Sequence, residues 1–180
     1  MLNTSIHIRR AVEADVSPLL ELMHGLAEFE AYAAEFAVDE STLRRQGFTR
    51  EPPDFYALVA EAPSVLPGLA GMLVYYLIPF TFRARPTLHI KELFVADAAR
   101  RLGVGEALMR AAAAAALEHD CATIQWQVAE WNTSAQQFYE RLGAQAAREW
   151  VTFALSESAL RALATQPLAP RGKGPAGNGG

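Results

Sequence analysis

The feature that most constrains the fold is a glycine-containing loop that leads directly into a helix rich in alanine. The loop Arg100–Gly105 reads Arg-Arg-Leu-Gly-Val-Gly, and the segment Gly103–His119 contains six consecutive alanines, Ala111–Ala116. Alanine has the highest helix propensity, and a helix with such small side chains can lie close against a sheet. The first amide groups of this helix lack intrahelical partners, so we expect the loop to bind a phosphate.

Two well-known phosphate loops do not match this segment. The dinucleotide fingerprint G-x-G-x-x-G needs a glycine where the chain has Leu108, and a Walker loop needs Gly-Lys-Ser/Thr where it has Gly105-Glu106-Ala107. A turn that only starts a helix is the alternative interpretation. The strand pattern before the loop and its two arginines favour the phosphate site.

The remaining pattern alternates strands with helices, which indicates a single mixed α/β domain over residues 1–164. Strand-like patterns occur at Ser5–Arg10, Phe55–Ala62, Leu69–Leu77, Thr87–Ala96, Thr123–Ala129 and Trp150–Leu155. Helical patterns occur at Val16–Ala27, Asp39–Leu43, Gly103–His119, Asn132–Gly143 and Ser156–Ala164. Residues 165–180 are rich in proline and glycine, and we expect them to form a flexible tail.

The strand pattern at Thr87–Ala96 loses its phase at Lys91-Glu92. Leu88 and Ile90 are apolar at even positions, whereas Leu93 and Val95 continue the period of two at odd positions. Either a β-bulge or a strand buried on both faces accounts for such a slip.

Composition excludes several classes of protein. With 20 acidic against 16 basic residues the net charge is −4, which argues against a nucleic-acid partner held by phosphate neutralisation. The longest apolar run, Leu69–Phe80, is far shorter than the ~20 residues that span a bilayer, and no secretory signal is visible. We therefore expect a cytoplasmic protein with no membrane partner. Cys121 is the single cysteine and the four histidines lack ligand spacing, so we expect no metal site.

The loop Arg100–Gly105 resembles the Q/R-x-x-G-x-G/A loop of the GNAT superfamily of N-acetyltransferases. Three further segments resemble its diamine (spermidine/spermine) acetyltransferase branch: Leu26–Glu30, Glu92–Val95, and Val128–Asn132 with the following Phe138-Tyr139. The resemblance runs over residues 6–163. It implies an α/β (α+β) fold with a mixed, mostly antiparallel, V-shaped central sheet flanked by helices, and it implies a homodimer.

The resemblance also implies the co-substrate, acetyl-CoA, which would lie between splayed strands at Leu88–Ala96 and Thr123–Ala129. Backbone groups on the first strand would pair with the pantetheine, the glycine loop would hold the pyrophosphate, and the segment after Asn132 would contact the coenzyme arm. The implied coenzyme-binding residues are Leu93, Phe94, Val95, Arg100, Arg101, Leu102, Gly103, Val104, Gly105, Glu106, Asn132, Ala135 and Tyr139.

Acetyl transfer to an amine requires a base and an acid. A primary amine with a pKa near ~10 must lose a proton before it attacks a thioester, and the departing thiolate needs a proton. Tyr139 follows Asn132 by two helical turns, so it lies on roughly the same helix face and is the candidate acid. Glu92 is the candidate base, or else a charge partner of the amine. The alternative interpretations are a packed core tyrosine and a solvated carboxylate.

The candidate acceptor-binding residues are Phe29, Glu30, Glu92, Gln125, Trp126, Gln127 and Glu149. The acidic helix end favours a polyamine or diamine, whereas Lys91, Arg83 and Arg85 favour an amino acid with a side-chain amine. The polyamine enzymes carry two adjacent acids where this chain has Lys91-Glu92. Two other functions stay open: a non-catalytic acyl-CoA-binding sensor, and an acetyltransferase that acts on a protein amine.

Overall fold

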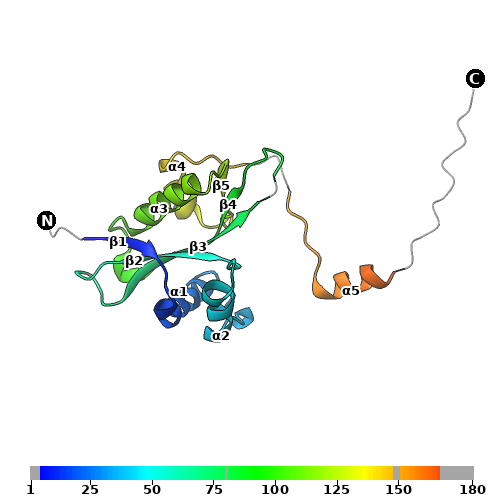
Figure 1. The fold of residues 1–180 in the computed structure, drawn as a ribbon, viewed down its shortest axis with the longest axis horizontal. Coiled ribbons are helices and arrows are strands. Elements are labelled where there is room, and N and C mark those ends of the chain that lie inside the picture. Colours follow the sequence, from blue (N-terminus) through cyan, green and yellow to red (C-terminus); the bar gives the residue numbers. More distant parts are fainter. Residues whose placement is uncertain (1–4, 80, 148–150, 167–180) are drawn as a thin grey trace, which may run out of the picture. The chain divides into compact units, whose positions relative to one another are not determined.

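The structure is a computed structural model, and it describes residues 5–79, 81–147 and 151–166 of the 180-residue chain. The chain divides into two compact units, Met1–Leu142 and Gly143–Gly180, which are described separately (Figure 1). Within the described ranges, none of the helices combines the length and the apolar character needed to cross a lipid bilayer.

A five-stranded sheet with the order β1-β2-β3-β4-β5 forms the centre of the first unit. The first four strands are antiparallel, and β5 runs parallel to β4. The strands are β1 (His7–Arg10), β2 (Tyr56–Glu61), β3 (Leu69–Ile78), β4 (Thr87–Val95) and β5 (Thr123–Gln125). This confirms the mixed, mostly antiparallel sheet that the family resemblance implied.

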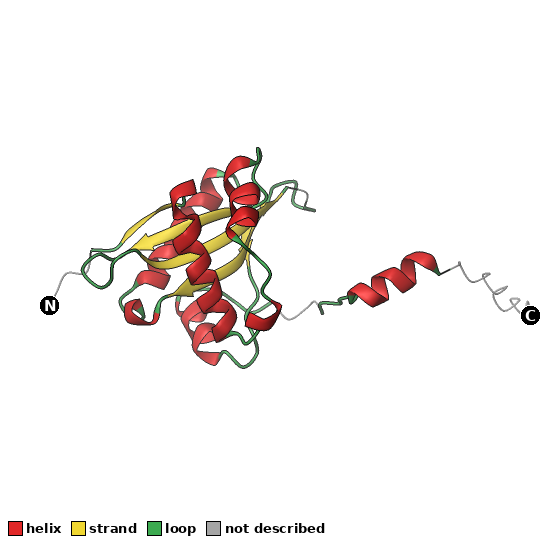
Figure 2. Ribbon diagram, turned by 90° about the horizontal axis from the view of Figure 1, so that it is seen from below, coloured by secondary structure: helices red, strands yellow, loops and turns green. Residues whose placement is uncertain are grey.

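Helices cover both faces of this sheet (Figure 2). The helices of the first unit are α1 (Val16–Phe29), α2 (Glu40–Leu43), α3 (Val104–Glu118) and α4 (Thr133–Arg141). Short helical turns are found at Glu13–Asp15, Ala33–Glu35, Arg44–Thr49 and Asp97–Ala99.

The apolar residues of β3 alternate between two cores, because successive side chains of a strand point to opposite faces. Met72 and Val74 pack with α1 and α2. Leu73 and Tyr75 pack with the alanine-rich α3, and side chains of α4 lie against the same core. The first unit therefore has an α1 face and an α3 face.

A β-bulge interrupts β4, which decides between the two interpretations of the phase slip. Val74 of β3 pairs with Glu92, and the next residue, Tyr75, pairs with Ile90. Lys91 is thus the extra residue, with no partner of its own on β3.

The bulge determines which side chains face the cleft described below. Ile90 and Leu93 both pack against the α3 core, although a regular strand would place them on opposite faces. Phe94 packs in the α1 core, and Glu92 opposite Val74 shares that face. The two residues between Ile90 and Leu93, Lys91 and Glu92, therefore both lie away from the α3 core.

The strand predicted at Thr123–Ala129 is shorter than expected. Pairing between β5 and β4 covers only three residue pairs, from Thr87 with Thr123 to His89 with Gln125, although β4 continues to Val95. The chain after Gln125 has no further strand partner among the described residues, so it leaves the sheet. The edge of β4 beyond His89 is open toward it.

The second unit contains one helix, α5 (Glu157–Thr165), in its described part. It confirms the helix predicted at Ser156–Ala164, and the Ser156 hydroxyl accepts a hydrogen bond from the Ala159 amide at 3.3 Å. The strand predicted at Trp150–Leu155 is wrong for residues 151–155, which have no regular structure and no strand partner within the part of the chain that the structure describes. Trp150 and most of the predicted tail lie outside the described residues. The domain boundary at residue 164 stays a prediction.

Candidate active site

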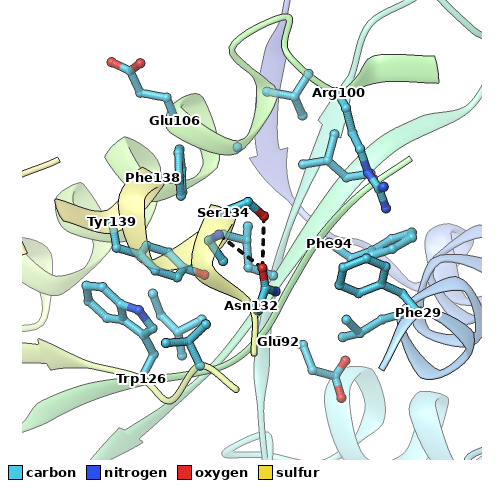
Figure 3. Close-up of a pocket in the computed structure, with 18 of the residues that line it drawn as sticks. Phe29, Glu92, Phe94, Arg100, Glu106, Trp126, Asn132, Ser134, Phe138 and Tyr139 are labelled. Atoms are coloured by element: carbon cyan, nitrogen blue, oxygen red, sulfur yellow. Dashed lines mark hydrogen bonds between the residues drawn. The ribbon is translucent and has the colours of Figure 1, made fainter. Parts of the chain in front are cut away.

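A cavity of about 600 Å³ opens between β4 and the chain that follows β5 (Figure 3). The C-terminal end of α1, the start of α3 and one side of α4 complete its walls. It brings together most of the predicted site residues: Phe29, Glu30, Glu92, Leu93, Phe94, Val95, Arg100, Arg101, Gly103, Val104, Gly105, Glu106, Trp126, Gln127, Asn132, Ala135 and Tyr139.

Two predicted residues are placed differently, and a third is not described. Leu102 is exposed and Gln125 is the last residue of β5, and neither lines the cavity. We expected Gln125 and Gln127 on one strand face and Trp126 on the other. Instead Trp126 and Gln127 both line the cavity, because strand alternation stops where β5 ends. Glu149 lies outside the described residues.

The structure adds lining residues that were not among the predicted site residues, namely Leu26, Tyr32, Ile90, Lys91, Ala99, Val128, Ser134, Phe138 and Arg141. Ser134 was within reach of prediction, since it is in the first turn of the helix that Asn132 caps. Tyr32 was not, because it follows the end of α1 and reaches the cavity only through the fold of the turn.

The start of α3 is built to receive an anion. Gly103 precedes the helix with a φ of 91°, a left-handed conformation that glycine adopts readily, and no side chain caps the first amides. The first helical hydrogen bond is that from the Ala107 amide to the Gly103 carbonyl, at 2.9 Å. The amides of residues 104–106 therefore keep their donors free of side-chain caps at the positive end of the helix dipole. This geometry fits the pyrophosphate of the coenzyme.

Arg100 does not extend freely over that loop. Its Nε donates to the Val95 carbonyl at 3.1 Å and its guanidinium pairs with Asp97 at 2.8 Å. The guanidinium also lies 5.3 Å from the ring centre of Phe29 and 5.6 Å from that of Phe94. Arg100 thus joins the aromatic wall of the cavity (Figure 3). Arg101 has no ion pair in the described part of the chain, so it is the better placed cation for a phosphate.

Asn132 fixes the orientation of α4 beside the cavity. Its Oδ1 accepts hydrogen bonds from the Ala135 amide and from the Ser134 hydroxyl, both at 3.1 Å (Figure 3). This confirms the helix cap predicted at Asn132. The cap directs the first turn of α4 into the cavity.

Tyr139 is packed between aromatic rings on α4 and the chain after β5. Its ring centre lies 4.9 Å from that of Trp126 and 5.1 Å from that of Phe138 (Figure 3). Burial, with a smaller contribution from the charge of Glu30, raises the pKa of Tyr139 to about 12. The phenol therefore stays protonated at neutral pH, which is the form that a proton donor needs.

Glu92 is an acid without a partner. Its Oε2 is buried and has no hydrogen bond among the described residues. Burial is the main cause that raises the pKa of Glu92; the nearby Lys91 lowers it, and Glu30 raises it. Buried polar atoms in proteins are almost always hydrogen-bonded, so an orphaned carboxylate oxygen in a cavity indicates a ligand contact.

Comparison with known proteins is consistent with this geometry. Residues 20–144 match the Acetyltransferase (GNAT) family. The thialysine N-epsilon-acetyltransferase of Mus musculus is 33% identical over 168 residues, which cover 89% of this chain and 98% of that protein. The L-ornithine N5-acetyltransferase of Arabidopsis thaliana is 26% identical, covering 87% of this chain and 86% of the relative.

Solved structures share the fold. An integron cassette protein from the mobile metagenome of V. cholerae superposes with a TM-score of 0.74 at 24% identity, covering 90% of this chain and 99% of its own. An aminoglycoside acetyltransferase from an uncultured soil sample gives a TM-score of 0.71 at 22% identity, covering 87% and 99%. The family match spans more than half of the chain, and the chain therefore belongs to the GNAT family of acetyltransferases.

Proposed function

We propose that this acetyltransferase moves the acetyl group of acetyl-CoA to a primary amine of a small molecule, either a diamine or polyamine or the side-chain amine of an amino acid. The observation that carries the proposal is one cavity with three complementary parts. These are the uncapped start of α3, the orphaned carboxylate of Glu92 and the protonated hydroxyl of Tyr139. The names of the relatives, which act on thialysine and L-ornithine, support a small amine acceptor.

The protein would hold the coenzyme by its backbone. Acetyl-CoA supplies the activated acyl group. The amides of residues 104–106, with Arg101, would bind its pyrophosphate. The open edge of β4 at residues 93–95 would hydrogen-bond the pantetheine and donate to the acetyl oxygen as negative charge develops there. Ser134 and Ala135 at the start of α4 complete this wall.

Glu92 and Tyr139 would handle the protons. Glu92 accepts a proton from the substrate ammonium, directly or through a water, and leaves a neutral amine. The nitrogen lone pair forms the C–N bond as the C–S bond breaks, and the hydroxyl of Tyr139 gives its proton to the departing sulfur. The acylated nitrogen loses its remaining extra proton through solvent to the Tyr139 phenolate, which restores the hydroxyl, and Glu92 releases to solvent the proton that it took. The reaction balances without a metal or a redox partner.

Release of free thiol from acetyl-CoA in the presence of an amine panel tests the proposal. We expect release with at least one amine, and in Tyr139→Phe we expect turnover to fall about 10²–10⁴-fold, because the proton donor is lost. Acetyl-CoA affinity by calorimetry is expected to change little. Tyr56→Phe is the matched control, since Tyr56 stacks on Tyr75 away from the cavity.

Each negative result has a defined meaning. Binding of acetyl-CoA without thiol release from any amine would instead indicate the non-catalytic sensor. Release only with peptides would indicate a protein acceptor. Near-normal turnover in Tyr139→Phe would remove Tyr139 from the mechanism and leave the activity itself intact.

The resemblance to the diamine acetyltransferase branch also supports a cytoplasmic homodimer as part of the proposal. Sedimentation of the full chain at several concentrations tests the dimer, and a monomer throughout would contradict it.

A further inference from the structure

The part of the cavity in which the amine substrate would bind is lined by two carboxylates and one ammonium group. Glu92 and Lys91 come from the β4 bulge, and Glu30 comes from the end of α1. The bulge leaves Lys91 and Glu92 on the same side of the strand. Burial raises the pKa of Glu92 and lowers that of His89, and in both cases the Lys91 charge acts to lower the pKa, so the ammonium lies near both groups.

None of these three charges is neutralised within the described residues. Lys91, Glu30 and Glu92 form no ion pair there, and the Glu92 Oε2 lacks any hydrogen bond. Lys91 and Glu92 are neighbours, yet they do not bond each other. Each is therefore available to a different group of one substrate.

The other two cations that the sequence offered for a substrate carboxylate are placed elsewhere. Arg85 pairs with Asp120 at 2.6 Å and donates to the carbonyls of Asp120 and Cys121, so it joins the start of β4 to the turn before β5. Arg83 lies 5.4 Å from the ring centre of Phe82 in an exposed loop. Neither lines the cavity, whereas Lys91 does.

We propose that Lys91 binds the carboxylate of the acceptor and so selects α-amino acids with a side-chain amine over diamines of the same length. This specificity rests on the proposed function. Two carboxylates and one ammonium complement a molecule with two amino groups and one carboxylate. A diamine leaves Lys91 without a counter-charge and brings a like charge toward it, which disfavours binding.

Three acceptors and two variants test this role. The acceptors are L-ornithine, its methyl ester and 1,4-diaminobutane, which present the same reacting amine with and without the carboxylate. For Lys91→Gln we expect kcat/KM with ornithine to fall about 10–100-fold, the range for a hydrogen bond to a charged group. We expect the ester and the diamine to change by no more than about twofold, and Lys91→Glu to favour the diamine over ornithine.

Arg83→Gln is the matched control, because it removes an equal charge outside the cavity, and we expect all three acceptors to be unaffected. An equal loss on all acceptors in Lys91→Gln would assign Lys91 a structural role, and no loss with ornithine would remove it from recognition. A wild-type protein that prefers the diamine would also overturn the inference while preserving the proposed function. Absence of thiol release with every amine would contradict the proposed function instead.

Discussion

Glu92 is held in surroundings that oppose its charged form. Its Oε2 is buried without a hydrogen bond among the described residues, and burial raises its pKa. Glu30 faces it as a second acid and Lys91 as a cation. Tyr32 and Tyr76 are nearby neutral phenols whose pKa values are raised mainly by burial, and the charge of Glu92 raises them further. Such a group destabilises the fold when ionised, which is tolerated where an active site needs it.

The first residue-scale prediction concerns pH and stability in Glu92→Gln. A pKa raised in the folded state means that the contribution of Glu92 to stability is full below its unfolded pKa. That contribution is lost as pH rises through the folded pKa. At neutral pH the variant avoids this loss, so we expect its thermal midpoint to rise by about 2 °C or more. Activity is expected to fall, because the proton acceptor is gone.

Two measurements separate these effects. In the wild type, kcat/KM is expected to decline as pH falls through the raised pKa of Glu92, and this acidic limb is expected to vanish in the variant. Scanning calorimetry at neutral and at acidic pH follows the stability difference, which is expected to shrink at acidic pH. A variant that keeps both the acidic limb and the wild-type activity would show that Glu92 is not the base.

At the scale of elements, Gly105 lies in the first turn of α3 and also lines the cavity, so a side chain there affects both the helix and the cavity. A Cβ added at Gly105 would lie 3.5 Å from the Phe138 ring and 3.8 Å from Val95, which are ordinary van der Waals distances. The methyl group of Gly105→Ala would therefore fit the fold while occupying space between two cavity walls. Alanine also has higher helix propensity, by up to ~1 kcal/mol in helix interiors.

We therefore expect Gly105→Ala to fold with unchanged or higher stability and to bind acetyl-CoA about tenfold more weakly, since a lost contact of about 1.4 kcal/mol is tenfold in affinity. Urea unfolding and calorimetric titration of the coenzyme measure the two quantities. If coenzyme binding weakened and the protein also lost much of its stability, the added methyl group would have disrupted the packing of the fold instead of only reducing the space for the coenzyme. Unaltered affinity would place the coenzyme away from this residue.

Elements whose signals are local were predictable from sequence. Asn132 predicts the start of α4 and Asp39 the start of α2, because each is a favoured N-cap residue. The Asp39 carboxylate accepts a hydrogen bond from the Thr42 amide at 2.7 Å. The phase slip at Lys91-Glu92 located the bulge, but the pairing with β3 was needed to show which residue is extra. The end of β5 at Gln125 was not predictable, because the length of a strand depends on its partners.

The candidate site shows the same contrast between residues with a local signal in the sequence and residues that meet only in the folded chain. The glycine loop and Tyr139 were expected at the site from short local motifs, from the family resemblance that those motifs carry and from the spacing of Tyr139 from Asn132 on one helix, and they do line the cavity. The stacking of Arg100 on Phe29 was missed, since the two residues are far apart in sequence and meet only through the packing of α1 against β4. Contacts of this kind depend on tertiary structure and leave no periodic pattern.

At the scale of the whole first unit, one ion cluster joins α1 to the sheet. Arg9 of β1 donates to Asp15 at 2.6 and 2.8 Å and to Glu61 of β2 at 2.8 Å. Asp15, just before α1, also accepts from the Val12 amide at 2.7 Å and is only 6% exposed. The Arg9 guanidinium holds the pKa of Asp15 below its usual range, as does the Val12 amide.

Because the pKa of Asp15 is depressed, its contribution to stability is present above its unfolded pKa and is lost as pH falls through the folded value. Arg9→Leu leaves a buried carboxylate without its cation, so we expect a loss of about 3 kcal/mol in unfolding free energy at neutral pH. The loss is expected to shrink in acid, where Asp15 is protonated. Urea unfolding of the full chain at neutral pH and at about pH 3 measures the loss in unfolding free energy under the two conditions.

Arg10→Leu provides the control on the neighbouring residue, because Arg10 forms an exposed pair with Glu118 at 2.8 Å. Exposed pairs contribute at most about 1 kcal/mol, and a change this small is expected at both pH values. The double variant Arg9→Leu, Asp15→Asn removes the stranded charge and is expected to recover part of the loss. If Arg9→Leu costs no more than Arg10→Leu, the join between α1 and the sheet depends on the apolar core alone, and the ion cluster does not stabilise it.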